Sequence, residues 1–308
     1  MKAAILDLGT NVYNLLIADI KNNSCKITKV FKVPSNTGAG GFVNPVIGPD
    51  AMKSSLRAID QIRSEIAKEG NVDVLKAFAT SAFRDASNGR EFALTIASET
   101  GIDVEIINGE REAELIYKGV RESILIYDEK VLICDIGGGS TELIIAGKRD
   151  IHFMKSFNLG VVRLREMFHR EDPIGRAELN SLESYLEEEL RPLVYACREH
   201  SPRIMIGTSG SFDTLREILC PSDDGLMPAI QLNMNKLEKF HFMLLSSTSK
   251  ERAQIKCMSP IRVDYIVTGS ILIQKILECC SVKELWQSSF SLKEGYMTEL
   301  AETYFKIK

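Results

Sequence analysis

Hydrophobic and polar positions along the chain follow two different periods, and these periods predict the elements. Short apolar runs bounded by glycine or polar residues predict buried strands, whereas apolar residues at i, i+3, i+4 and i+7 predict amphipathic helices. The predicted strands cover residues 3–8, 12–20, 25–33, 73–79, 103–107, 130–136, 141–147, 150–157, 203–207 and 283–287. The predicted helices cover residues 50–69, 88–99, 110–123, 175–199, 211–219 and 292–306. This mixture predicts an α/β protein.

The order of these elements restarts in the second part of the chain. The sequence ILDLGTN at 5–11 resembles ICDIGGGST at 133–141. Each copy joins a buried strand, an aspartate, a glycine-bearing turn and a second strand. The repetition predicts a duplicated two-domain α/β fold with a cleft between the halves. We place the domains at residues 1–125 and 126–308 because the second set of strands begins there.

Composition and charge narrow the class of protein. The chain has 308 residues, which suggests about two domains, and its 44% hydrophobic and 26% charged content is typical of a globular protein. A net charge of -4 does not favour nonspecific binding to nucleic acid, so we expect no nucleic-acid partner. No apolar run approaches the roughly 20 residues that a membrane-spanning helix needs, so we expect no membrane partner.

The cysteines and the first residues indicate the compartment. The seven cysteines include no CxxC pair and no Cys/His spacing typical of a metal site. Buried thiols in a reducing environment are the simplest interpretation. The N-terminal sequence turns polar after six residues, too soon for a signal peptide. We therefore expect a cytoplasmic protein.

Three glycine-bearing turns are candidates for binding phosphate. Glycine lets backbone N–H groups approach an anion closely, and successive N–H groups form an anion-binding nest. The turn at 137–141 has three glycines and two hydroxyls, and the turn at 9–11 repeats its position. The turn at 207–211 precedes a predicted helix, whose N-terminus favours anions. A glycine-rich hairpin and a capped helix start are the purely structural alternatives. The hairpin alternative leaves Asp135 and Glu142 unexplained, and an aspartate at a strand end could hold a hard cation such as Mg²⁺.

Six motifs in a fixed order carry a family resemblance. They are DLGTN (7–11), ATSAFRDASN (79–88), INGEREAELIYKGV (107–120), DIGGGSTEL (135–143), FNLGVVRLRE (157–166) and GTSGS (207–211). Together they resemble the exopolyphosphatase/guanosine pentaphosphate phosphatase (Ppx/GppA) family. This resemblance implies the actin-like (ribonuclease H-like) fold of the sugar kinases, actin and the heat-shock chaperones. It also implies the short two-domain form, with a C-terminal helix at about 296–308 that packs back on the first domain.

The resemblance implies a role for each candidate residue. Glu112 would be the catalytic base, and Arg84 would face the phosphate chain. Asp7, Asp135 and Glu142 would surround Mg²⁺ or Mn²⁺. The implied phosphate-binding positions, together with the third turn, are Gly9, Thr10, Asn11, Gly137, Gly138, Gly139, Ser140, Thr208, Ser209 and Gly210.

Each of these residues could instead have a purely structural or surface role. Glu112 could be one of several similar acids on an exposed helix, with Glu110 the rival for its role, and Arg84 a surface arginine paired with Asp85 or Glu91. We interpret Arg163 and Arg262 as structural.

The implied reaction is in-line attack of water on a terminal phosphorus, with release of orthophosphate. The substrate would be inorganic polyphosphate or guanosine pentaphosphate (pppGpp), and a homodimer is an expectation at family level. Three positions depart from the family pattern, namely Val12, Asn14 and Asn36. They motivate an alternative, a weakly catalytic sensor that binds polyphosphate or a guanosine polyphosphate. A kinase of the same fold is a third hypothesis, although no acceptor pocket can be read from the sequence.

Overall fold

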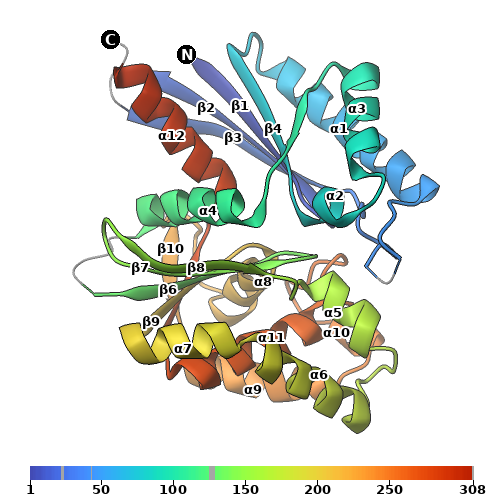
Figure 1. The fold of residues 1–308 in the computed structure, drawn as a ribbon, viewed down its shortest axis with the longest axis vertical. Helices are drawn as coiled ribbons and strands as arrows, with labels where there is room; N and C mark the ends of the chain where they lie inside the picture. Colours follow the sequence, from blue (N-terminus) through green and yellow to red (C-terminus); the bar gives the residue numbers. More distant parts are fainter. Residues whose placement is uncertain (22–23, 43, 125–128, 307–308) are drawn as a thin grey trace. The chain divides into compact units, whose positions relative to one another are not determined.

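The chain forms two compact units, which are described separately. The computed structural model describes residues 1–21, 24–42, 44–124 and 129–306 (Figure 1). Unit 1 comprises Met1–Gly119 and Ser291–Lys308, and unit 2 comprises Val120–Phe290. The domain boundary that we predicted between residues 125 and 126 lies outside the described residues.

Unit 1 contains a mixed sheet of order β3-β2-β1-β4-β5. Strands β1, β2 and β3 pair antiparallel, whereas β4 pairs parallel to β1 and β5 parallel to β4. The strands are β1 (Lys2–Leu8), β2 (Val12–Lys21), β3 (Ser24–Pro34), β4 (Val74–Ala79) and β5 (Val104–Ile106). The helices are α1 (Pro49–Lys68), α2 (Ser81–Asp85), α3 (Gly89–Thr100), α4 (Gly109–Ser123, whose last residues belong to unit 2) and α12 (Leu292–Lys306).

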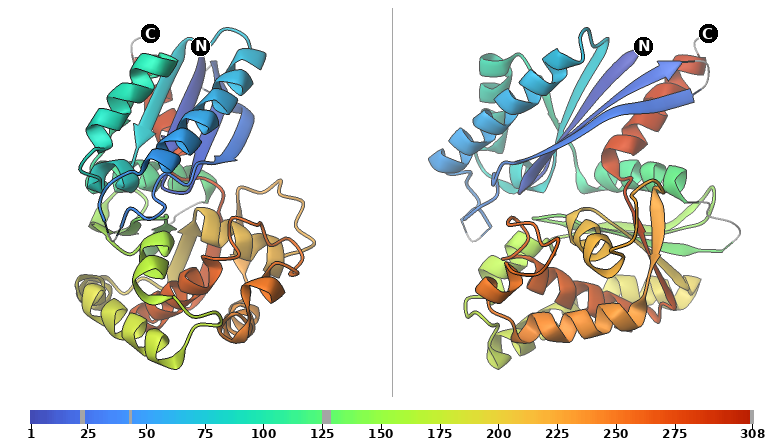
Figure 2. Two further views of the ribbon diagram at one scale, coloured as in Figure 1. Left: turned by 90° about the vertical axis from the view of Figure 1, so that its right-hand side faces the viewer. Right: turned by 180° about the vertical axis from the view of Figure 1, so that it is seen from behind.

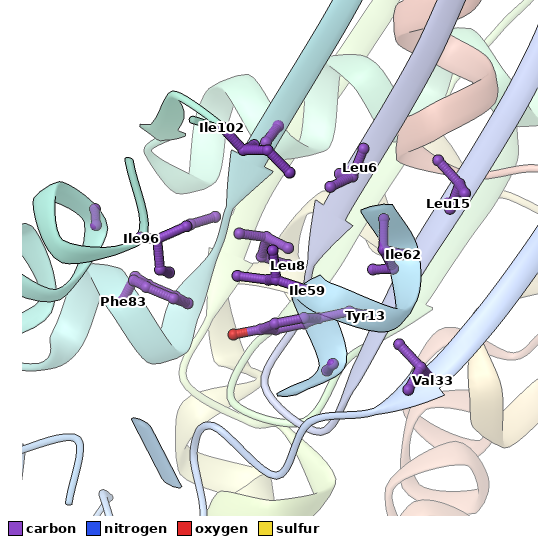
Figure 3. Packing of buried hydrophobic residues seen from close by; sticks show 14 of the residues in the cluster. Leu6, Leu8, Tyr13, Leu15, Val33, Ile59, Ile62, Phe83, Ile96 and Ile102 are labelled. Atoms are coloured by element: carbon purple, nitrogen blue, oxygen red, sulfur yellow. The ribbon is translucent and has the colours of Figure 1, made fainter. Parts of the chain in front are cut away.

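The core of unit 1 lies between this sheet and the helices α1 and α3 (Figure 3). Alternate residues of each strand face it, as a period of two requires. Leu6, Leu8 and Leu15 come from the strands, and Ile59 and Ile62 come from the buried face of α1. The helical periodicity of residues 50–69 therefore identified the face that packs on the sheet.

Helix α12 covers the opposite face of the same sheet. It contacts β1, β2 and β3, and Figure 2 shows it running diagonally across these strands. Phe78 on β4 meets Tyr296 on α12 edge to face, with ring centroids 4.8 Å apart. The last element of the chain thus completes unit 1, whose other elements come from the first 119 residues.

Unit 2 repeats the plan of unit 1 with an added edge strand. Its sheet has the order β10-β11-β9-β6-β7-β8. The strands are β6 (Val131–Ile136), β7 (Thr141–Ala146), β8 (Ile151–Phe157), β9 (Ile204–Thr208), β10 (Ala229–Leu232) and β11 (Glu284–Ser288). The helices are α5 (Val161–Phe168), α6 (Arg176–Glu189), α7 (Arg191–His200), α8 (Gly210–Leu219), α9 (Met234–Ser246), α10 (Ser249–Arg252) and α11 (Ile266–Cys280).

The two sheets share one topology. In each, an antiparallel three-strand meander (β1–β3 or β6–β8) is followed by parallel pairing of a fourth strand, β4 or β9, with the first. The α/β class and the duplicated actin-like arrangement are therefore confirmed. Both glycine turns of interest join the first two strands of a meander.

The structure corrects some sequence predictions. The single helix predicted at 175–199 is two helices, because Pro192 at the start of α7 has no N–H for a continuous helix and Leu190 ends α6. Helices α2 and α5 and strand β10 were not predicted, and no bounds were predicted for α9, α10 and α11. The thiols of Cys25 and Cys257 are exposed, so the expectation of buried cysteines is wrong for these two.

The described residues contain no helix with both the length and the apolar composition needed to cross a bilayer.

Candidate active site

The turn between β1 and β2 places a carboxylate opposite an amide. Asp7 pairs in register with Asn14, and Asn14 Nδ2 donates to Asp7 Oδ2 at 3.1 Å. A Cβ on Gly9 would lie 2.8 Å from the carbonyl oxygen of Val12, which is too close for a side chain. The turn therefore requires glycine, as the sequence pattern indicated.

The next two residues fix this turn to its surroundings. The hydroxyls of Thr10 and Ser81 lie 3.4 Å apart, which connects the turn to α2. The carbonyl oxygen of Asn11 accepts the N–H of Ser35 at 2.9 Å. Asn11 is 6% exposed, and its Nδ2 has no hydrogen-bond partner among the described residues. A buried amide N–H₂ without a partner is suited to an oxygen of a ligand.

Glu112 and Arg84 form an ion pair within unit 1. Arg84 Nη1 donates to Glu112 Oε2 at 2.9 Å and to the carbonyl oxygen of Ile107 at 3.1 Å. Arg84 ends the short helix α2, and Glu112 lies near the start of α4, where the Asn108 side chain accepts the N–H of Arg111 at 2.8 Å. The predicted base and the predicted phosphate-facing arginine are thus brought together.

Burial distinguishes Glu112 from the acids that resemble it in sequence. Glu112 is 7% exposed, whereas Glu110 lies on the exposed side of α4. Glu105 is exposed on β5 and pairs with Lys76 at 2.5 Å. Glu112 is therefore not one of several equivalent exposed acids, as the alternative interpretation assumed.

The turn between β6 and β7 places two carboxylates opposite each other. Asp135 pairs in register with Glu142, and both are buried. Ser156 on β8 donates to Glu142 Oε1 at 2.7 Å. Burial, reinforced by the charges of Asp135 and Glu142, raises the pKa of the neighbouring Cys134 thiol well above its usual value. The negative charge of the carboxylate pair therefore affects the neighbouring Cys134 thiol within the sheet.

The start of α5 holds the glycine turn at 137–139. Its three carbonyl oxygens accept from Val161 N, Val162 N and Arg163 Nε at 3.0, 2.8 and 2.8 Å, respectively. A Cβ on Gly160 would lie 2.3 Å from the backbone of this turn, so only glycine permits the approach. Arg163 thus supports the loop, in keeping with the structural role expected for it.

The opposite edge of this turn carries donors. Gly138 and Gly139 have carbonyl partners in α5, but within the described part of the chain their N–H groups donate to no acceptor. Ser140 follows directly and is 3% exposed. Adjacent free N–H groups in a glycine turn form an anion-binding nest, which suits a phosphate oxygen.

The third turn joins β9 to α8. Ser209 has a φ of 70°, and the Thr208 hydroxyl donates to the carbonyl oxygen of Phe290 at 3.0 Å. A Cβ on Gly210 would lie 1.6 Å from Arg262 Nη2, so the guanidinium rests directly on this glycine. The turn therefore combines a helix N-terminus with a nearby cation. The Thr208 hydroxyl already donates its proton to Phe290 and is not available as a donor to a ligand.

In each unit, candidate residues follow the C-terminal ends of neighbouring parallel strands. In unit 1, the ends of β1 and β4 are parallel neighbours, so the first turn and α2 with Arg84 follow side by side. In unit 2, Asp135 pairs in register with Thr208, so the second and third turns are neighbours. The sequence reading overlooked the partners Ser81 and Ser156. Only Ser156 had a signal, since hairpin register places it opposite Glu142.

The two carboxylates in unit 2 are suitable ligands for a divalent cation. Mg²⁺ is usually held by one or two carboxylates, with water and substrate oxygens completing the coordination. The opposed pair Asp135 and Glu142 meets this requirement. Within the described residues, no three His, Cys, Asp or Glu side chains gather as a metal-binding group.

Comparisons with known proteins point to one family. The model of the Ppx/GppA phosphatase family matches residues 17–304. The fold is similar to that of a crystallised exopolyphosphatase from Cytophaga hutchinsonii, with a TM-score of 0.94 and 33% identity over 98% of each chain. The Aquifex aeolicus Ppx/GppA protein has a TM-score of 0.79 and 26% identity, and the match covers 100% of this chain and 99% of that one. Exopolyphosphatase 1 of Mycobacterium tuberculosis is 28% identical over 305 residues, 96% of this chain and 87% of that protein.

Proposed function

Because the chain belongs to the Ppx/GppA phosphatase family, we propose that it is an exopolyphosphatase, which releases orthophosphate from the end of inorganic polyphosphate. Membership confirms the resemblance carried by the motifs and the phosphohydrolase class it implied. The choice of polyphosphate is supported by the exopolyphosphatases from Cytophaga and Mycobacterium. Hydrolysis of pppGpp is a second activity that the same site would allow.

The observation that carries the proposal is the pairing of Glu112 with Arg84. A carboxylate beside a guanidinium supplies a proton acceptor and a phosphate-binding cation at one place. The guanidinium holds Glu112 Oε2, and the N-terminus of α4 adds partial positive charge around the carboxylate. This arrangement suits the activation of a water molecule next to a bound phosphate.

In the proposed reaction, Glu112 accepts a proton from water while the water oxygen attacks the terminal phosphorus. The bond from this phosphorus to the bridging oxygen breaks, and the chain leaves one phosphate shorter. In unit 1, Arg84 and the Asn11 amide would bind phosphate oxygens, and in unit 2 the N–H groups of Gly138 and Gly139 would do the same. Asp135 and Glu142 would hold Mg²⁺ or Mn²⁺, which would neutralise charge on the phosphate oxygens.

The proposal assigns the remaining candidates to the same reaction. Asp7 would act with the metal, and Gly9, Thr10, Gly137 and Ser140 would bind phosphate. The third turn, with Thr208, Ser209 and Gly210, would do the same. A cytoplasmic location and a homodimer remain part of the proposal.

A panel of substrates tests this function. Orthophosphate release is measured with short polyphosphate, long polyphosphate, pppGpp and ATP in the presence of Mg²⁺. We expect polyphosphate to be the best substrate, and Glu112→Gln to lower kcat by roughly 10²–10⁴, the usual contribution of a general base. Glu110→Gln is the matched control, because this acid lies exposed on the same helix. Binding without turnover would refute the hydrolase, and equal rates for wild type and Glu112→Gln would refute the base.

A further inference from the structure

Helices α4 and α12 touch through their backbones. A Cβ on Gly295 would lie 1.8 Å from the carbonyl oxygen of Leu115, and a Cβ on Gly119 would lie 2.0 Å from that of Ser291. Each glycine thus removes a side chain where the other helix passes. Helices normally pack with their axes 8–10 Å apart because side chains separate them. The position of α4 against α12 is therefore defined by contacts that leave little freedom.

An ionic cluster fixes the same two helices one turn further along α12. Arg111 donates from Nη2 to Glu299 Oε1 at 2.5 Å and from Nη1 to Glu299 Oε2 at 3.1 Å. Lys118 donates to Glu299 Oε2 at 2.5 Å. The bond to Glu299 raises the pKa of Arg111, and the bond to Arg111 lowers the pKa of Glu299, as expected for a mutually stabilising pair. A two-pronged arginine–carboxylate pair also restricts orientation.

These contacts surround Glu112 along α4. Arg111 precedes it and is held by Glu299, while Leu115 follows it by one turn and lies against Gly295. Helix α12 also packs on β1, the strand that carries Asp7 at its end. The same helix therefore lies against α4, which carries the predicted base, and against β1, which leads to the first phosphate-binding turn (Figure 2).

We propose that α12 sets the position of the Glu112 carboxylate, with Gly295 and Glu299 as positioning residues. This inference rests on the proposed function, since it assumes that Glu112 is the base. A displacement of about 1 Å at a reacting group can lower a rate by roughly 10²-fold. An added methyl group at Gly295 must displace one helix by a comparable amount, because its neighbour is backbone.

Two variants and their controls test the inference. Gly295→Ala should lower kcat by roughly 10–100-fold and change KM less than about threefold, because the displacement affects proton transfer rather than phosphate binding. Glu299→Gln keeps the shape and removes the charge, and it should lower kcat by roughly 3–10-fold. Gly48→Ala is the control for the first, since no atom lies within 4 Å of the added Cβ. Glu65→Gln is the control for the second, since Glu65 also joins two cations, Lys29 and Lys68, but on α1.

Each substitution is then repeated in the Glu112→Gln background. If Gly295 and Glu299 act through Glu112, neither change should lower kcat further there, because the group they position is already lost. Equal losses in both backgrounds would overturn the inference. If Gly295→Ala does not fold, Glu299→Gln decides the question by the same criterion, and its failure to alter kcat would also overturn it. Wild-type activity of Glu112→Gln alone would instead refute the proposed base.

Discussion

The β1–β2 and β6–β7 hairpins have the same backbone plan and different charges. In both, a glycine follows two residues after the aspartate. A Cβ added to this glycine would lie close to the carbonyl oxygen three residues further on, which is that of Val12 for Gly9 and that of Ser140 for Gly137. In both, the strand-end aspartate pairs in register with the residue seven positions later. That residue is Asn14 in the first hairpin and Glu142 in the second.

The residue opposite the aspartate is an amide in the first hairpin and a second acid in the second hairpin. The Asn14 amide donates to Asp7, so this carboxylate is satisfied within the protein. Asp135 faces Glu142, and two opposed carboxylates repel unless a cation lies between or beside them. The two hairpins share their turn geometry, whereas the second has more negative charge. We therefore expect the metal to depend on the second hairpin more than on the first.

The largest effect is expected from a substitution that removes the charge of the aspartate in the second hairpin. Asp135→Asn should lower kcat/KM by roughly 10³-fold, because metal ions contribute several kcal/mol to the stabilisation of charge in phosphoryl transfer. The same variant should raise the Mg²⁺ concentration needed for half-maximal activity. Both quantities are measured as orthophosphate release over a Mg²⁺ titration.

Asp7→Asn is the matched variant in the other hairpin. It should lower activity by a smaller factor, about 10–100-fold, and raise the Mg²⁺ requirement less than Asp135→Asn does. An equal shift in the Mg²⁺ requirement for the two variants would mean that the hairpins share the metal equally, contrary to the division inferred from Asn14 and Glu142.

The hairpins also differ in how closely their glycines are packed. An added Cβ would lie 2.8 Å from a carbonyl oxygen at Gly9 and 3.1 Å at Gly137. Gly9→Ala should therefore lower the free energy of unfolding by about 1–3 kcal/mol, the usual cost of overpacking, and Gly137→Ala by less than about 1 kcal/mol. Urea-induced unfolding measures both values.

Gly147→Ala is the control for these glycine variants. It lies in the turn after β7, where the nearest atom to an added Cβ is 3.8 Å away. Its stability should be close to that of the wild type. A larger loss for Gly137→Ala than for Gly9→Ala would show that the second turn is the more tightly constrained one.

Local features of these hairpins could be predicted from the sequence, and long-range pairings could not. The glycine turns and strand ends follow from adjacent residues, since apolar runs and glycines report local backbone geometry. The Arg84–Glu112 pair depends on how α2 packs beside α4, and no periodicity reports that contact. The α4–α12 crossing depends on glycines in distant parts of the chain, Gly119 and Gly295.

Missed elements have similar causes. Strand β10 is a short edge strand whose one partner among the described strands is β11, so its four residues carry no alternating pattern long enough to recognise. Helix α2 is also short, and the motif around Arg84 gave no helical period. The break between α6 and α7 did have a local signal in Pro192, but the regular leucine spacing outweighed it in the prediction.

Histidine content distinguishes the two units in a further way. The four histidines of the chain, His152, His169, His200 and His241, all belong to unit 2. Burial lowers the pKa of His241, and burial followed by nearby arginines lowers that of His169. Unit 2 should therefore be the unit whose stability responds to mild acid.

The smallest expected effect concerns His169. Burial comes first among the causes that lower its pKa, followed by Arg165 and Arg252, while Glu178 and Asp172 act in the opposite direction. Its Nδ1 is buried and has no partner among the described residues. Below a pH of about 6.5 the unfolded chain binds a proton that the folded protein does not, so stability falls as the pH falls. Hydrogen exchange of β6 and β7 between pH 7 and 5.5 should report this loss, and His169→Gln should reduce it while β1 and β2 remain unaffected. An unchanged pH dependence in this variant would assign the acid response to groups other than His169.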